Sequence, residues 1–314
     1  MGENIMDKVL VFGHKSPDTD TITSAIAMAN LKTKLGEKAE ARRLGNINKE
    51  TKYALDYFKV EEPELLEEVE ENTDVILVDH NEFEQSVKGI EKANIKMVVD
   101  HHRINNFKTS EPLYYIAEPV GCTATIIYKL YKQNDVEVDR KIAGLLLSAI
   151  VSDTLLLRSP TTTEDDKKAL KELEKIAKVD IDIYGLDLLK AGTDLSSFSS
   201  EELINLDSKL FTVKNKKFAI SQVNTVDIQD IMRNKADIEE KIKQEVNAKG
   251  LDFFGFCVTD ILNGNSEMIA LGDNAGVVEK AYNVKLEDNS AFLEGVVSRK
   301  KQIVPIITKN IEEL

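Results

Sequence analysis

Each of the four histidines in this chain comes directly after a short apolar run rich in β-branched residues. The three junctions read Val-Leu-Val-Phe-Gly-His14, Val-Ile-Leu-Val-Asp79-His80 and Met-Val-Val-Asp100-His101-His102. Runs of this kind are typical of buried strands. In an open parallel sheet, ligands bind outside the carboxyl ends of the strands. The junctions therefore predict that imidazole and carboxylate groups meet at one edge of one sheet.

The rest of the first 190 residues also indicates an α/β domain. Short apolar runs alternate with amphipathic stretches, which predicts βα units on a mostly parallel sheet flanked by helices. We expect strands over residues 9–12, 75–78 and 96–99. We expect helices over 21–35, 123–132, 140–151 and 164–177, the first ended by Gly36 and the last capped within 161–163.

A second, smaller α/β domain is expected after a break in this pattern at Lys190-Ala-Gly-Thr193, which a serine-rich stretch follows. We place the first domain at residues 1–190, a hinge linker at 191–195 and the second domain at 196–314. The sheet of the second domain is predicted to be mixed or antiparallel, with strands over 210–213 and 218–223 around the basic turn 214–217. A helix is expected over 238–247, and a hairpin over 251–271 around Asn263-Gly-Asn265.

Length, charge and cysteine content exclude several classes of protein. The 314 residues suffice for two domains, and 41 basic against 55 acidic residues give a net charge of −14. Nucleic-acid binders normally present a basic face, so we expect no nucleic-acid partner. The N-terminus lacks a signal pattern, and the longest apolar run is far shorter than the roughly 20 residues that span a bilayer. We expect a cytoplasmic protein without a membrane partner, and buried free thiols at Cys122 and Cys257.

Three acidic residues are candidates to join the histidines as metal ligands. Asp18 and Asp20, in His14-Lys-Ser-Pro-Asp-Thr-Asp20, could instead form a turn and cap the following helix. Asp153 could be a loop residue after a helix, although a carboxylate is unfavourable at a helix C-terminus, which hints at a metal partner. The absence of thiolates disfavours structural zinc, and an all-carboxylate Mg²⁺ site would not need imidazoles. Manganese or cobalt suits this mixed set best.

Two further segments could contact an anion. The basic run Ser298-Arg299-Lys300-Lys301-Gln302 could be a solvated surface, but apolar residues on both sides could hold it rigidly. Gly121-Cys122-Thr123-Ala-Thr125 opens a helix, and its backbone N–H groups could meet a phosphate or simply be capped.

Four motifs, taken in their order along the chain, resemble those of the DHH phosphoesterase superfamily. They are His14 to Asp20, Asp79-His80-Asn81, Asp100-His101-His102 and Ser152-Asp153. With the basic run 298–302, the chain resembles a family II inorganic pyrophosphatase over residues 8–305. The resemblance implies a DHH domain followed by a DHHA2 domain, with the active site between them. It also implies a manganese-dependent diphosphate phosphohydrolase that forms a homodimer. The short segment 57–74 leaves no room for a regulatory nucleotide-binding insertion.

The resemblance further implies a role for each candidate residue. One metal ion would bind His14, Asp18 and Asp79, and a second would bind Asp20, Asp79, His101 and Asp153. The substrate would contact His102, Lys209, Arg299 and Lys300, with His102 as candidate proton donor. A hydroxide that bridges the two metals would attack one phosphorus, and the C-terminal cations would bind pyrophosphate on domain closure. The implied cofactors are two Mn²⁺ per subunit, with Co²⁺ as a substitute, and Mg²⁺ that accompanies the substrate.

Three alternative functions stay open on the sequence. One is a phosphodiesterase or exonuclease of the same superfamily, whose C-terminal domain carries a glycine-rich motif with a histidine. This chain has no histidine beyond His102 and no Gly-Gly pair. A second is hydrolysis of short polyphosphates by the same basic residues. The third is a non-catalytic metal-binding protein, which the cations of the second domain disfavour.

Overall fold

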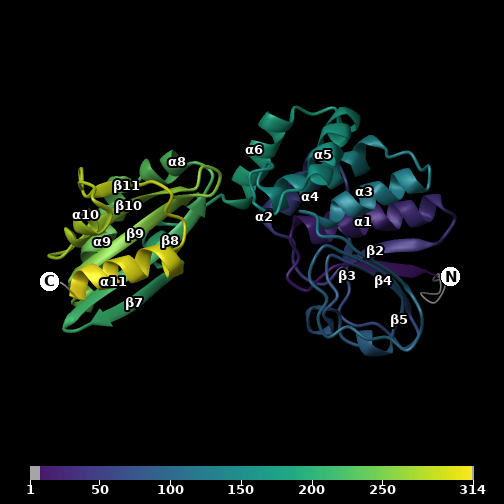
Figure 1. Cartoon of the computed structure of the whole chain (residues 1–314), viewed down its shortest axis with the longest axis horizontal. Helices are drawn as coiled ribbons and strands as arrows, with labels where there is room; N and C mark the ends of the chain where they lie inside the picture. Colours follow the sequence, from purple (N-terminus) through teal and green to yellow (C-terminus); the bar gives the residue numbers. More distant parts are fainter. Residues whose placement is uncertain (1–7, 313–314) are drawn as a thin grey trace. The chain divides into compact units, whose positions relative to one another are not determined.

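The structure, a computed structural model, describes residues 8–312 of the chain. The chain divides into two compact units, the first ending at Gly192 and the second beginning at Thr193 (Figure 1). Helix α6 (Ile181–Gly192) runs to this point, so Ala191 and Gly192 lie at the end of a helix. Within the described residues, no helix combines the length and the apolar character needed to cross a membrane.

The first unit is built on a six-stranded sheet in which every pairing is parallel, in the order β3-β2-β1-β4-β5-β6. This confirms the predicted parallel α/β fold. The three expected strands are β1, β4 and β5, and they are neighbours at the centre of the sheet. The sequence missed β2, β3 and β6, because their partly exposed or charged residues lack a buried apolar pattern. The strands are β1 (Val9–Phe12), β2 (Ala39–Arg43), β3 (Glu64–Leu65), β4 (Asp74–Val78), β5 (Asn94–Asp100) and β6 (Tyr114–Ala117).

Helices cover one face of this sheet (Figure 1). α1 and α3 lie against the strands, and α4 packs on α1 and α5. On the opposite face of the sheet, short turns and loops cover a cluster of buried apolar residues that includes Phe12, Leu77 and Val98. Besides α6, the helices are α1 (Thr19–Lys34), α2 (Lys49–Phe58), α3 (Thr123–Gln133), α4 (Arg140–Thr154) and α5 (Glu164–Ala177).

Several helix boundaries differ from the sequence-based expectation by one to three residues, and two of these differences involve candidate ligands. α1 begins at Thr19 rather than at residue 21, because the Asp18 side chain caps it by accepting a 2.9 Å hydrogen bond from the Thr21 backbone N–H. α4 continues to Thr154, three residues further than expected. Asp153 is therefore in the last helical turn, and the expectation that it could be a loop residue was wrong. α5 has the expected bounds and begins with a capping box.

The second unit is a three-layer α/β arrangement around a five-stranded sheet, ordered β11-β10-β9-β8-β7. Only β8 and β9 pair in parallel, which confirms the expected mixed sheet. One face packs against α7, α8 and α9, and the other against α10 and α11. The strands are β7 (Ser208–Val213), β8 (Lys216–Thr225), β9 (Phe253–Asp260), β10 (Asn265–Leu271) and β11 (Ser290–Leu293). The helices are α7 (Ser200–Asn205), α8 (Ile228–Met232), α9 (Lys235–Lys249), α10 (Val277–Tyr282) and α11 (Val304–Glu312), the last preceded by a π-helical turn, Arg299–Ile303.

The packing of α2 on α4 generates a prediction. Gly144 in α4 faces the ring of Phe58, and a Cβ at this position would overlap three ring atoms. Gly144→Ala should therefore lower the free energy of unfolding by about 1–3 kcal/mol, as overpacking of a rigid core does. Urea denaturation of the full chain measures the change. The Gly144→Ala/Phe58→Leu double variant should lose less free energy of unfolding than the sum of the losses in the two single variants. Additive losses would contradict a contact between the two side chains.

Candidate active site

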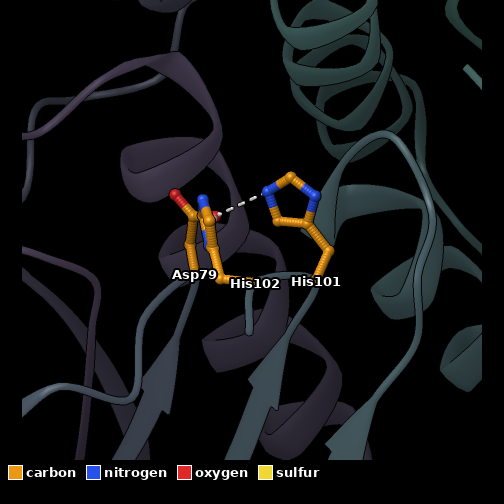
Figure 2. A group of neighbouring side chains, drawn as sticks. All are labelled: Asp79, His101 and His102. Atoms are coloured by element: carbon orange, nitrogen blue, oxygen red, sulfur yellow. Dashed lines mark ion pairs between the residues drawn. The ribbon is translucent and has the colours of Figure 1, made fainter. Parts of the chain in front are cut away.

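The predicted ligands meet at the carboxyl ends of the three central strands. Asp79 follows β4 directly, His101 follows β5 directly, and His14 lies two residues beyond β1. The Oδ2 atom of Asp79 is 3.5 Å from Nε2 of His14, and its Oδ1 atom is 3.5 Å from Nε2 of His101. Figure 2 shows His101 and His102 beside Asp79. The two oxygens of one carboxylate thus face imidazoles from two different strands.

Asp79 is held rigidly in this position. Its side chain is buried, and two hydroxyl groups donate to it, Thr21 to Oδ2 at 2.7 Å and Thr123 to Oδ1 at 3.1 Å. Its backbone adopts φ 57°, a left-handed conformation that costs a non-glycine residue about 1–3 kcal/mol and is common at functional sites. Burial alone would raise the pKa of Asp79, but hydrogen bonds from His101 and His14 hold it well below the usual range.

On one side of Asp79, His14 and Asp18 complete a group whose ligand atoms lie within 4.8 Å of one another. The Oδ2 atom of Asp18 is 3.5 Å from Nε2 of His14. Burial lowers the pKa of His14, but the carboxylates of Asp18 and Asp79 outweigh it and raise this pKa to about 10. Asp18 uses Oδ1 for the helix cap and Oδ2 toward His14. The cap and the ligand interpretations of Asp18 are therefore compatible.

On the other side, His101 connects Asp79 to Asp153, with its Nε2 atom 3.9 Å from Oδ2 of Asp153. The Nδ1 atom of His101 lies 3.0 Å from the carbonyl oxygen of Val120. A carbonyl only accepts, so Nδ1 carries a proton, and Nε2 is the nitrogen that faces the carboxylates and would bind a metal once it has lost its own proton. Histidines that bind metals are commonly oriented in this way. Burial lowers the pKa of His101, but Asp79 more than compensates and raises it to about 9.

Asp20 and Asp153 form a third group with Cys122, again with ligand atoms within 4.8 Å. Burial, and then the charge of Asp79, raises the pKa of Asp20 to about 7. Burial, followed by the charges of Asp20 and Asp79, raises the pKa of Asp153 well above its usual value. Cys122 is a buried free cysteine, as expected, and burial raises the pKa of its thiol. The sequence motifs did not predict that Cys122 lies close to the candidate ligands Asp20 and Asp153.

The N-terminus of α3 is used by Asp20 and not by a separate anion. The backbone N–H groups of Thr123 and Ala124 donate to the Asp20 carboxylate at 2.7 and 3.1 Å, and the Ser24 hydroxyl donates at 2.6 Å. Of the two interpretations of this segment, capping is therefore the one that the structure supports. The capping carboxylate comes from α1, about one hundred residues away in sequence.

The chemistry of these donors fits a manganese-type cation. The imidazole nitrogens of His14 and His101 lie 3.5–3.9 Å from the oxygens of Asp18, Asp79 and Asp153, farther than the 2.7–2.9 Å that is typical of charge-assisted hydrogen bonds. The neighbouring carboxylates of Asp20, Asp79 and Asp153 repel one another, and bound cations would relieve that repulsion. Metal ligands bind without their protons, so cations would replace the protons that the histidines otherwise hold.

His102 differs from the other histidines of the cluster, because its side chain is 53% exposed. Its Nδ1 atom lies 2.9 Å from Oδ1 of Asp100. A carboxylate only accepts, so Nδ1 carries the proton and is not available to a metal, while Nε2 is the remaining nitrogen. The hydrogen bond that His102 donates to Asp100, more than any other cause, raises the pKa of His102. Asp100 therefore orients His102, a role that the sequence analysis did not assign although Asp100 belongs to the motif.

Two cavities border this cluster. A cavity of about 250 Å³ is lined by residues that include His14, Asp79, His80 and His102. A larger one, about 570 Å³, is lined by residues that include Asp18, His101 and Asp153. Arg103 lines both and is the one Arg or Lys side chain among their lining residues. The sequence analysis did not predict a role for Arg103. The one signal in the sequence is that Arg103 directly follows His101 and His102.

The predicted substrate cations Lys209, Arg299 and Lys300 belong to the second unit. Lys209 is on β7, and the other two begin the π-helical turn before α11. The guanidinium of Arg299 is paired with Asp207, with Nη2 2.8 Å from Oδ1 and Nη1 donating to the Asp207 carbonyl oxygen. The backbone N–H of Arg299 donates to Gln222 on β8 at 3.1 Å. This basic run is therefore anchored to the sheet, and the Arg299 side chain is only 12% exposed.

Comparisons with known proteins show the family to which the chain belongs. The DHH family, N-terminal domain, matches residues 8–150, and the DHHA2 domain matches residues 186–310. A manganese-dependent inorganic pyrophosphatase of Bacillus subtilis (strain 168) is 58% identical over 309 residues, which cover 98% of this chain and 100% of the relative. A crystal structure from Methanococcus jannaschii, assigned to the family II inorganic pyrophosphatases, superimposes with a TM-score of 0.61 at 40% identity and covers 97% of this chain and 99% of that one. The chain belongs to the family II, manganese-dependent inorganic pyrophosphatases.

Proposed function

We propose that this protein hydrolyses inorganic pyrophosphate to two phosphates, with manganese as its cofactor. The observation that carries the proposal is the arrangement around Asp79, whose two oxygens face two separate sets of nitrogen and oxygen ligands. Such a carboxylate suits two cations that share one ligand. The near full-length similarity to a manganese-dependent inorganic pyrophosphatase supports the same substrate and metal.

In this proposal His14, Asp18 and Asp79 would hold one Mn²⁺, and the second would bind Asp79 together with Asp20, His101 and Asp153. Each subunit would thus contain two Mn²⁺, which Co²⁺ could replace because it accepts the same ligands. Mg²⁺ would accompany the polyanionic substrate. When bound, a pair of cations that shares a carboxylate activates a water molecule as the nucleophile near neutral pH.

The side chains of the protein would bind and orient the substrate. Arg299 offers a planar fork for phosphate oxygens, while Lys209 and Lys300 supply compact positive charges. The two bonds to Asp207 use one proton each of Nη1 and Nη2, so Nε–H and the other two Nη protons stay available for a substrate oxygen. We propose that domain closure around residues 191–195 brings these cations to the pyrophosphate. His102 would donate a proton from Nε2 to the leaving phosphate.

The proposed enzyme is a homodimer. Strand β6 forms one edge of the parallel sheet, and Tyr114 on this strand is 77% exposed. An edge strand with an exposed aromatic side chain can pair with a second copy of itself.

The substrate assignment predicts a clear order of activities. With Mn²⁺ present, phosphate release from pyrophosphate should be much faster than from tripolyphosphate, and a short oligonucleotide should remain intact. A phosphate-release assay in parallel with Mn²⁺, Co²⁺ and Mg²⁺ measures both substrate and metal preference. Cleavage of the oligonucleotide would instead place the protein among the phosphodiesterases.

The shared role of Asp79 predicts a loss of both metals in one variant. Asp79→Ala should abolish Mn²⁺ binding at both positions, because each set of ligands loses a member. Metal content after dialysis, measured by atomic absorption, tests this. Full manganese content in the variant would rule out the bridging assignment.

Lys300→Ala is expected to separate metal binding from substrate binding. The variant should retain its manganese but lose roughly 100-fold in kcat/KM for pyrophosphate, a loss typical of removing one charge-stabilising group. Lys217→Ala is the matched control, since Lys217 belongs to the other basic run of the same unit, at the start of β8. Equal activities of the two variants would contradict the role of Lys300.

A further inference from the structure

Glu50 on α2 lies outside the groups of candidate ligands but touches two segments that carry them. Its Oε1 atom accepts hydrogen bonds from the hydroxyl of Thr19 on α1 and from the hydroxyl of Ser152 on α4, both at 2.5 Å. A single carboxylate oxygen thus links α2 to α1 and to α4, which is about one hundred residues away in sequence.

The two linked residues are immediate neighbours of the proposed ligands. Thr19 stands between Asp18 and Asp20, and Ser152 directly precedes Asp153. A movement of either residue therefore displaces a ligand of the centre around Asp79. The remaining hydrogen bonds of Asp20 go to the start of α3 and to Ser24 on its own helix. α1 and α4 also pack directly on each other, and Glu50 adds a hydrogen-bonded link between the start of α1 and the end of α4.

Glu50 is enclosed on its other side by the end of α6. A Cβ atom at Gly192 would lie 2.7 Å from Oε2 of Glu50 and 3.0 Å from its Cβ. Any residue other than glycine at position 192 would therefore require the Glu50 carboxylate to shift. Burial raises the pKa of Glu50, against the effect of its two hydroxyl donors. A carboxyl group in such a place is costly unless it is hydrogen-bonded, so its position depends on both hydroxyls.

We propose that Glu50 is a positioning residue of the metal centre, which sets the distance between the ligands on α1 and the ligand on α4, and that Gly192 keeps Glu50 in place. This inference rests on the proposed metal-binding function. Glu50 itself would contact neither metal nor substrate. Outer groups that orient ligands commonly change metal affinity by 10–100-fold when they are removed.

The inference predicts different effects for two substitutions at the same position. Glu50→Ala removes the link and should raise the dissociation constant for Mn²⁺ by roughly 10–100-fold. Glu50→Gln keeps an Oε1 acceptor for both hydroxyls and should bind Mn²⁺ nearly as well as the wild type. Gly192→Ala retains every polar group but displaces the carboxylate, so it should weaken binding in the same direction as Glu50→Ala.

Titration calorimetry of the metal-free full chain with MnCl₂ measures these constants without any need for turnover. Asp56→Ala is the matched control, because it also removes a carboxylate from α2, where Asp56 is exposed and pairs with Lys52. Circular dichroism and thermal unfolding in EDTA establish that each variant is folded. If Glu50→Ala does not fold, Ser152→Ala takes its place, since it removes one of the two hydrogen bonds and should also weaken Mn²⁺ binding.

An unchanged Mn²⁺ affinity in the folded Glu50→Ala variant, or in Ser152→Ala where it replaces that variant, would overturn the inference. An equal loss in Glu50→Gln would also overturn it, because charge rather than position would then be the cause. If the wild-type chain itself took up no Mn²⁺, the proposed metal centre would fail and this inference with it. If the wild-type chain binds Mn²⁺ and hydrolyses pyrophosphate, but Glu50→Ala does not change the Mn²⁺ affinity, only this inference fails and the proposed function stands.

Discussion

The first unit is organised around one buried carboxylate at the end of a central strand. Asp79 lies between two imidazoles, accepts two hydroxyl hydrogen bonds and adopts a left-handed backbone conformation. Such a charge is stable in the interior only if opposite charge and hydrogen bonds surround it. The parallel sheet supplies these partners, because it brings the ends of β1, β4 and β5 to the same edge. The fold and the centre thus depend on the same strand order.

Much of this could be predicted from the sequence because the signals are local. The central strands are continuous apolar runs, and each ends in the residues that reach the centre. Strand β2, between β3 and β1, was not predicted because its residues, Ala-Glu-Ala-Arg-Arg, show no buried apolar pattern. The end of α4 was placed too early because a carboxylate is unfavourable in the last turn of a helix, whereas Asp153 lies in that turn and close to other acidic residues.

Several hydrogen bonds that the sequence analysis did not predict join residues that are distant in the chain. Ser152 and Glu50 are 102 positions apart, and Thr123 and Asp20 are 103 apart. Such pairs leave no periodicity or spacing that a local pattern could carry. Arg299 shows the same limit in the second unit, since its partner Asp207 lies 92 positions earlier. Motifs identify the groups that do chemistry, whereas the fold alone identifies the groups that orient them.

The divided use of Asp18 couples two properties of the protein that could otherwise change independently. One oxygen of this carboxylate caps α1, and the other faces His14. Loss of this one side chain would therefore weaken the start of the helix, by about 0.5–2 kcal/mol, and would remove a candidate ligand at the same time.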